Sequence, residues 1–212
     1  MEPLIRHTGR AVALRRDDID TDQIVPAEFC KRITRTGYHD ALFANWRAEG
    51  GFVLDRPEHA GATVLLTGRN FGIGSSREHA VWALRDGGFT VVVASGFGDI
   101  FRRNALNNGL LPVDLPHPLV RELMDLADAD PALEVTVDLE QRRLSCAGHE
   151  APFPIDDRAR RQLLDGHDAI QATLLRDDLI TAYEQRRAPW LPTIPRGAFA
   201  EAAPLTVPED RR

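Results

Sequence analysis

The chain has 212 residues, of which 43% are hydrophobic and 27% charged, as in ordinary soluble globular proteins. Its net charge of −6 argues against nucleic acid as the main partner, because phosphate contacts need a basic face. No apolar run approaches the roughly 20 residues of a membrane helix, and the first seven residues lack an apolar signal region, so we expect a cytoplasmic protein.

The first predicted strand is short, Ala11 to Leu14, and a charged loop follows it from Arg15 to Gln23. Residues 24–26 are expected to be extended, because proline disfavours helix in the residue before it.

Strand-like and helix-like segments then alternate. The strands are apolar runs rich in β-branched residues, and each helix ends at a glycine. In chain order they are a strand at 62–67, a helix at 77–86, a strand at 89–94, a helix at 99–108 and a strand at 110–113. This alternation predicts an α/β fold with right-handed crossovers and a mostly parallel sheet flanked by helices.

The remaining sequence predicts a helix, a strand that could pair as a hairpin, and two further helices. These segments are 119–127, 134–139 with 143–147, 157–164 and 177–187. Prolines recur beyond Ala188. We predict one domain over residues 1–192, with a C-terminal helical extension, and a variable or disordered tail over 193–212.

A glycine-rich stretch, Gly68 to Ser76, joins a predicted strand to a predicted helix. Glycines let the backbone approach a ligand closely, and a helix N-terminus favours anions. Arg77, expected in the first turn, adds a fork that can grip a carboxylate with two hydrogen bonds. A serine hydroxyl held here sits in a field that would stabilise its deprotonated form.

A structural alternative stays open for the same residues. Ser75 to Glu78 fits the capping-box pattern, in which a serine caps the helix and a glutamate three residues on reaches back. The stretch is not an obvious nucleotide site, because it lacks the third glycine of the dinucleotide fingerprint and the ending of a P-loop.

Two charged stretches have alternatives of the same kind. The acidic motif Asp18 to Pro26 could bind a hard metal or form a solvated turn, but it lacks the glycine and distal glutamate of a calcium loop. Lys31, Arg32 and Arg35 could bind a second carboxylate or form a solvated basic face.

The cysteines and histidines predict no metal site. Cys30 and Cys146 give neither a disulfide framework nor zinc spacing. An iron–sulfur cluster usually takes three or four cysteine ligands, so this chain should not hold one by itself. The seven histidines are scattered without ligand spacing.

These stretches together resemble one family, the small subunits of 3-isopropylmalate dehydratase. The resemblance rests on five motifs in register: Asp18–Pro26, Lys31–Gly37, Gly68–Ala80, Phe101–Gly109 and Ala182–Pro192. It covers roughly residues 1–192. The family is similar to the swivel domain of aconitase, a β/β/α fold that closes over a [4Fe–4S] cluster held by other domains, here a separate large subunit.

The resemblance implies an activity and roles for matched residues. It implies a hydro-lyase of leucine biosynthesis that dehydrates 2-isopropylmalate to isopropylmaleate and rehydrates it to 3-isopropylmalate. Ser75 would remove the proton from carbon. Arg77 and Ser76 would bind substrate, and one of Lys31, Arg32 and Arg35 would hold the other carboxylate. The residues expected to orient them through hydrogen bonds are Asp20, Thr21, Asp22 and Asn70.

Two other functions remain open at this point. The chain could serve a related hydro-lyase that acts on homoaconitate or on citraconate and methylmalate. It could also be a non-catalytic, anion-binding regulatory module that uses the same helix N-terminus.

Overall fold

A computed structural model describes residues 1–74, 77–188 and 190–192. The chain separates into two compact units, Met1–Ala172 and Thr173–Arg212. The predicted boundary at residue 192 stays a prediction, since the residues beyond it lie outside the described part.

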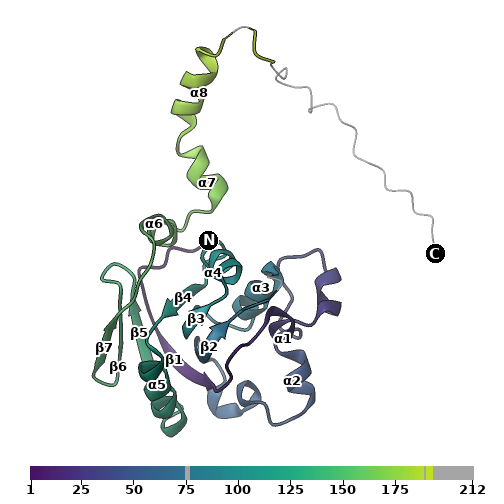
Figure 1. The fold of residues 1–212 in the computed structure, drawn as a ribbon, viewed down its shortest axis with the longest axis vertical. Helices are drawn as coiled ribbons and strands as arrows, with labels where there is room; N and C mark the ends of the chain where they lie inside the picture. The colour runs from purple at the N-terminus through teal and green to yellow at the C-terminus, as the bar shows by residue number, and fades with distance from the viewer. Residues whose placement is uncertain (75–76, 189, 193–212) are drawn as a thin grey trace, which may run out of the picture. The chain divides into compact units, whose positions relative to one another are not determined.

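The first unit is built on a seven-stranded sheet with the order β4-β3-β2-β1-β5-β6-β7 (Figure 1). Its strands are β1 (Arg6–Leu14), β2 (Val64–Phe71), β3 (Val91–Phe97), β4 (Leu111–Asp114), β5 (Glu134–Asp138), β6 (Arg143–Cys146) and β7 (His149–Pro152). Strands β1 to β4 are joined by parallel pairings. Strands β1, β5, β6 and β7 are joined by antiparallel pairings.

The predicted α/β class is confirmed, but the sheet is mixed and not mostly parallel. Strand β5 returns beside β1 in the opposite direction, with Gly9 opposite Val135, so the hairpins extend the sheet from that edge. The predicted hairpin is present, with Thr136 opposite Ser145. Strand β7 was not predicted, because its four residues, His-Glu-Ala-Pro, carry little β-branched or aromatic signal.

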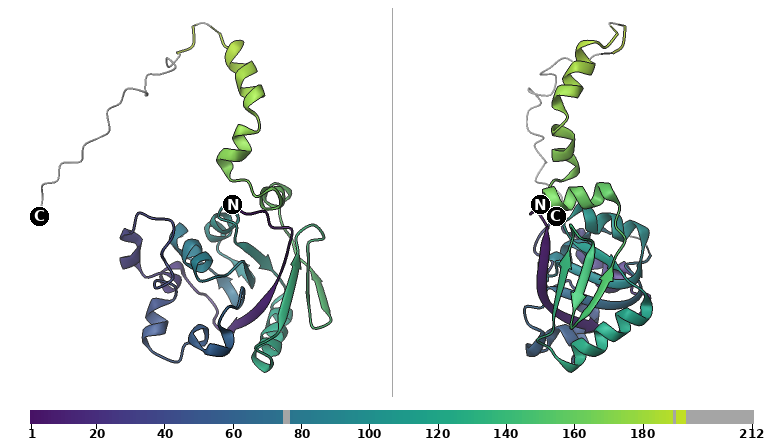
Figure 2. Two further views of the ribbon diagram at one scale, coloured as in Figure 1. Left: turned by 180° about the vertical axis from the view of Figure 1, so that it is seen from behind. Right: turned by 90° about the vertical axis from the view of Figure 1, so that its left-hand side faces the viewer.

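Helices cover both faces of the parallel strands. They are α1 (Thr21–Ile24), α2 (Ala44–Ala48), α3 (Glu78–Asp86), α4 (Asp99–Asn107), α5 (His117–Ala129) and α6 (Asp157–Asp165), with 3-10 turns η1 (Ala27–Lys31), η2 (Val53–Asp55) and η3 (Pro57–His59). Successive side chains of a strand point to opposite faces of the sheet. The neighbours Leu65 and Leu66 are therefore each fully buried, but in different hydrophobic cores on the two faces. Figure 2 shows the hairpins and the α1–α2 segment on opposite sides of the parallel strands.

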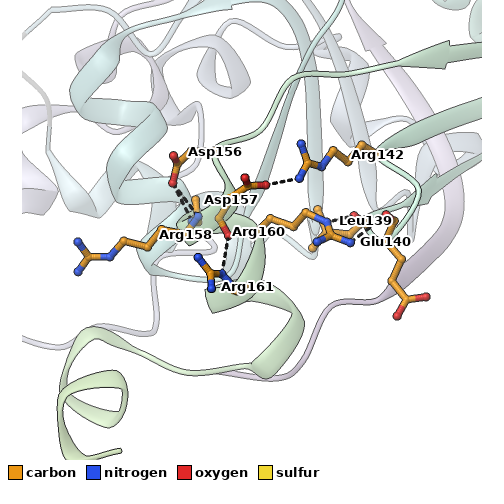
Figure 3. Close-up of polar contacts among 9 residues, drawn as sticks. Leu139, Glu140, Arg142, Asp156, Asp157, Arg158, Arg160 and Arg161 are labelled. Atoms are coloured by element: carbon orange, nitrogen blue, oxygen red, sulfur yellow. Dashed lines mark hydrogen bonds and ion pairs between the residues drawn. The ribbon is translucent and has the colours of Figure 1, made fainter. Parts of the chain in front are cut away.

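Helix α6 is held against the turn between β5 and β6 (Figure 3). Asp156 caps it by accepting two backbone N–H groups of the first turn, at 2.9 and 3.1 Å. Arg160 donates to the carbonyl oxygens of Leu139 and Glu140, each at 2.9 Å. Arg142 pairs with Asp157. The two bonds from Arg160 satisfy carbonyl groups of the turn, which lie outside the strand pairings.

The predicted C-terminal helical extension is present, although one of its helices, α7 (Ala169–Leu174), was not itself predicted. The other, α8, spans Asp177–Gln185. Several of their apolar side chains are exposed, among them Leu174, Leu179 and Tyr183. Within the described ranges, no helix is long and apolar enough to cross a membrane.

Candidate functional site

The acidic motif after β1 lies against the glycine-rich stretch, whose first four residues, Gly68 to Phe71, form the end of β2. The backbone N–H of Asp18 donates to the carbonyl of Arg69 at 2.8 Å, and that of Gly72 donates to the carbonyl of Ile19 at 2.7 Å. Strands β1 and β2 are parallel neighbours, so their carboxyl ends meet at one edge of the sheet. Two motifs that are distant in sequence thereby form one surface.

Backbone geometry at this edge explains the glycines. Gly72 has φ +72°, and a Cβ there would lie 2.3 Å from Cγ of the buried Phe101. Asn70 and Asp18 also have positive φ, 54° and 55°, and the Asn70 amide donates to the Asp18 carboxylate at 2.6 Å. Such conformations are costly outside glycine and persist where the surrounding contacts determine them.

Residues Thr21–Ile24 of the acidic motif form a short helix, so the predicted loop is wrong over residues 21–23 and the predicted extended conformation is wrong at Ile24. Asp20 and Gln23 build a capping box around α1: the Gln23 N–H donates to Asp20 Oδ1 at 2.7 Å, and the Asp20 N–H donates to Gln23 Oε1 at 2.9 Å. Pro26 restricts only the residue directly before it, so Val25 is extended while Ile24 is helical. Thr21, in the first position of the turn, is buried.

Arg77 directly precedes α3 as its N-cap, in an extended conformation, and is not in the first turn as predicted. Its Nη1 forms an ion pair with Asp22, one of the residues expected to orient the site. The hydrogen bond to Asp22 raises the pKa of Arg77 above its usual value, so the guanidinium stays charged. Ser75 and Ser76, the predicted base and its neighbour, lie outside the described residues.

The capping-box alternative does not fit Glu78. Helix α3 begins at Glu78, so this glutamate is the first helical residue and not the third. Its carboxylate accepts a hydrogen bond from the Asn108 amide at 2.8 Å. It therefore reaches across to the end of α4 and not back along its own chain.

The structure separates the three candidate cations between residues 31 and 35. Arg32 binds Asp40 through both terminal nitrogens, each at 2.7 Å, and this bond lowers the pKa of Asp40. The Arg35 guanidinium lies 5.9 Å from the centre of the Trp82 ring, and Lys31 is exposed at the end of η1. Arg32 is thus committed to a carboxylate of its own chain, which leaves Lys31 and Arg35 as candidates.

The candidate site residues that the structure describes line neither of two cavities found on the chain. These cavities, of about 470 and 210 Å³, are lined by other residues, and neither lining includes Arg77, Asp22 or the cations at positions 31–35. In the part of the chain that the structure describes, no group of three or more His, Cys, Asp or Glu side chains could hold a metal ion. Burial raises the pKa of the Cys146 thiol, which favours its protonated form.

Comparison with known proteins decides the family. The model of the aconitase C-terminal domain matches residues 1–118, and a LeuD model matches residues 121–157. The 3-isopropylmalate dehydratase small subunit of Frankia alni is 54% identical over 91% of this chain and 99% of its own length. That of Acidothermus cellulolyticus is 56% identical over 91% and 98%. The chain belongs to the 3-isopropylmalate dehydratase small-subunit family.

A solved structure of this family supports the fold. The 3-isopropylmalate dehydratase LeuD of Methanocaldococcus jannaschii is 26% identical, with a TM-score of 0.61, and it covers 85% of this chain and 99% of its own. The predicted resemblance to the dehydratase small subunits is therefore confirmed.

Three polar residues at this small-subunit site were not assigned a role by the sequence. Asp18 accepts a hydrogen bond from Asn70, while Asn108 accepts one from Trp82 of α3 and donates one to Glu78 at the start of that helix. Asp18 and Asn108 both belong to motifs that carry the family resemblance. Their partners lie on other elements, which is why the motifs alone did not reveal what they bind.

Proposed function

We propose that this chain is the small subunit of 3-isopropylmalate dehydratase and that, with a large subunit, it interconverts 2-isopropylmalate and 3-isopropylmalate through isopropylmaleate in leucine biosynthesis. The observation that carries the proposal is the 54% identity to a small subunit matched over 99% of its length. The meeting of Arg77 with the acidic motif at one sheet edge supports it.

The large subunit is proposed to hold a [4Fe–4S] cluster. This chain has two cysteines, Cys30 and Cys146, fewer than the three or four that such clusters usually take. When bound, the cluster supplies a Lewis acid for the departing hydroxyl group. The chain's free thiols suit a reducing compartment, so we expect the pair to work in the cytoplasm.

Arg77 is proposed to bind one substrate carboxylate. The guanidinium has five N–H donors in a fixed fork, and the ion pair with Asp22 is made through Nη1. Asp22 can therefore orient the fork while other donors face the substrate. Arg35 or Lys31 would bind the second carboxylate, since Arg32 is held by Asp40.

Ser75 is proposed to take the proton from the carbon next to a carboxylate. The charge that develops spreads onto that carboxylate, where a fixed cation stabilises it most as the transition state forms. A neutral serine hydroxyl is a poor base, so a dry, cation-rich site would have to stabilise the serine alkoxide, whose Oγ then accepts the proton. A large subunit that covers the site would exclude water in this way.

Reconstitution under anaerobic conditions tests the proposal. Isopropylmaleate absorbance is followed for this chain alone, for a cluster-loaded large subunit alone, and for the mixture. Activity only in the mixture supports a split dehydratase. A mixture that binds but does not turn over would direct the assay to homoaconitate and methylmalate, and absence of binding would favour the regulatory module.

Substitution of the two serines tests the role of the base. Ser75→Ala should still bind the large subunit but lose turnover, whereas Ser76→Ala should mainly raise KM. A wild-type rate for Ser75→Ala would contradict its assignment as the base.

A further inference from the structure

The motif Phe101–Gly109 has no role in the chemistry above, yet its asparagine at position 108 makes three side-chain bonds. Asn108 follows α4 directly as its C-cap. Its Oδ1 accepts from the Trp82 indole N–H at 3.1 Å. Its Nδ2 donates to the Glu78 carboxylate and to the Asn104 carbonyl, each at 2.8 Å. The amide therefore uses both of its donors and one acceptor position.

The hydrogen bond to Glu78 connects Asn108 to Arg77. Glu78 is the first residue of α3 and is joined directly to Arg77, which forms no side-chain cap on the helix. The bond from Asn108 fixes the Glu78 side chain to the end of α4. The backbone at Arg77 is thus held through Glu78 by the end of α4, and the Arg77 side chain is held by the ion pair with Asp22.

The hydrogen bond from Trp82 connects Asn108 to Arg35. The Trp82 ring lies 5.9 Å from the Arg35 guanidinium and 4.8 Å from the His79 ring. A cation over an indole face is attracted by the ring quadrupole. Asn108 fixes the ring's edge through Nε1, so it also fixes the surface against which Arg35 lies.

We infer that Asn108 is a positioning residue that places Arg77 through Glu78 and, through Trp82, also places Arg35, one of the two candidates for the second carboxylate. The inference rests on the proposed function, because it concerns the binding of a dicarboxylate. Aspartate cannot replace Asn108, since its carboxylate has no N–H to donate and would face the Glu78 carboxylate.

The test compares Asn108→Asp with the double variant Glu78→Gln/Asn108→Asp, in which the glutamine amide can donate to the new carboxylate. With the large subunit and isopropylmaleate, Asn108→Asp should lower kcat/KM by about 10- to 100-fold, because small displacements of binding groups cost this much. The double variant should recover most of the loss. Large-subunit affinity should stay unchanged, and Asn107→Asp, an exposed neighbour, is the matched control.

Trp82→Phe tests the connection to Arg35 separately from the connection to Arg77. It keeps an aromatic ring near Arg35 but removes the N–H that donates to Asn108. This variant should raise KM several-fold with little change in kcat. If Asn108→Asp fails to fold, the KM of Trp82→Phe tests the inference in its place. Wild-type kinetics in a folded Asn108→Asp, no recovery in the double variant, or an unchanged KM in Trp82→Phe would overturn the inference. An inactive wild-type pair would overturn the proposed function along with it.

Discussion

The cations proposed to bind substrate, at the carboxyl ends of the parallel strands, differ from the arginines beside the antiparallel hairpins β5–β7 in what holds them. Arg142 and Arg143 pair with carboxylates, and Arg160, on the adjoining helix α6, donates through two nitrogens to backbone carbonyls. Arg77 pairs with Asp22 through Nη1, and the Arg35 guanidinium lies 5.9 Å from the centre of an indole ring. A cation that binds a ligand must be oriented without all its donors being used. By this criterion Arg32, whose two terminal nitrogens are held by Asp40, resembles Arg160.

A pair of glycine substitutions should give the largest contrast. Gly72→Ala would drive a Cβ against Phe101 at positive φ, so we expect a loss of about 2–4 kcal/mol in the free energy of unfolding and loss of activity. Gly148 in the hairpins also has positive φ but nothing within 4 Å of its Cβ position, so Gly148→Ala should cost only about 1 kcal/mol. Denaturant unfolding measures both, and equal losses would contradict the role of Phe101.

The next contrast concerns arginines. Arg77→Lys should lower kcat/KM about 100-fold, or ~2.7 kcal/mol, because lysine cannot present the planar fork. Arg142→Lys in the hairpins should leave kcat/KM within about two-fold, since it only pairs with Asp157. Steady-state kinetics of the reconstituted pair measures both. A retained rate in Arg77→Lys would remove Arg77 from the site.

Arg160→Ala should have the opposite profile to Arg77→Lys. It removes two bonds to the Leu139 and Glu140 carbonyls, which should cost about 1–2 kcal/mol in the free energy of unfolding and leave kcat unchanged. Thermal unfolding and kinetics on the same samples check this. A fall in kcat would show that the hairpins influence the site.

The smallest effect concerns Asp40. Its pKa is lowered from the usual 3.8 chiefly by the hydrogen bond to Arg32, so its contribution to stability is present above that value and is lost as pH falls through the lowered one. The difference in Tm between the wild type and Asp40→Asn should therefore shrink as pH drops from about 6 to about 2. A difference that grows on acidification would contradict the pair.

Local patterns predicted much of this molecule. The apolar runs, the glycines that end helices and the alternation of strand and helix located the parallel half, because each signal depends on neighbours along the chain. The five motifs identified the family in the same way, without any knowledge of which residues touch. They also brought Arg77, Asp22 and Asn70 to notice as candidates.

Tertiary structure decided what those residues bind. The antiparallel return of β5, the capping box at Asp20 in place of Ser75, and the commitment of Arg32 to Asp40 all depend on contacts that motifs do not encode. Asn108 is the clearest case, since it meets Glu78 and Trp82 across two helices. The sequence determines the charge and shape of a side chain. Which of its hydrogen-bond donors remain available to a ligand depends on the neighbours that the tertiary structure places around it.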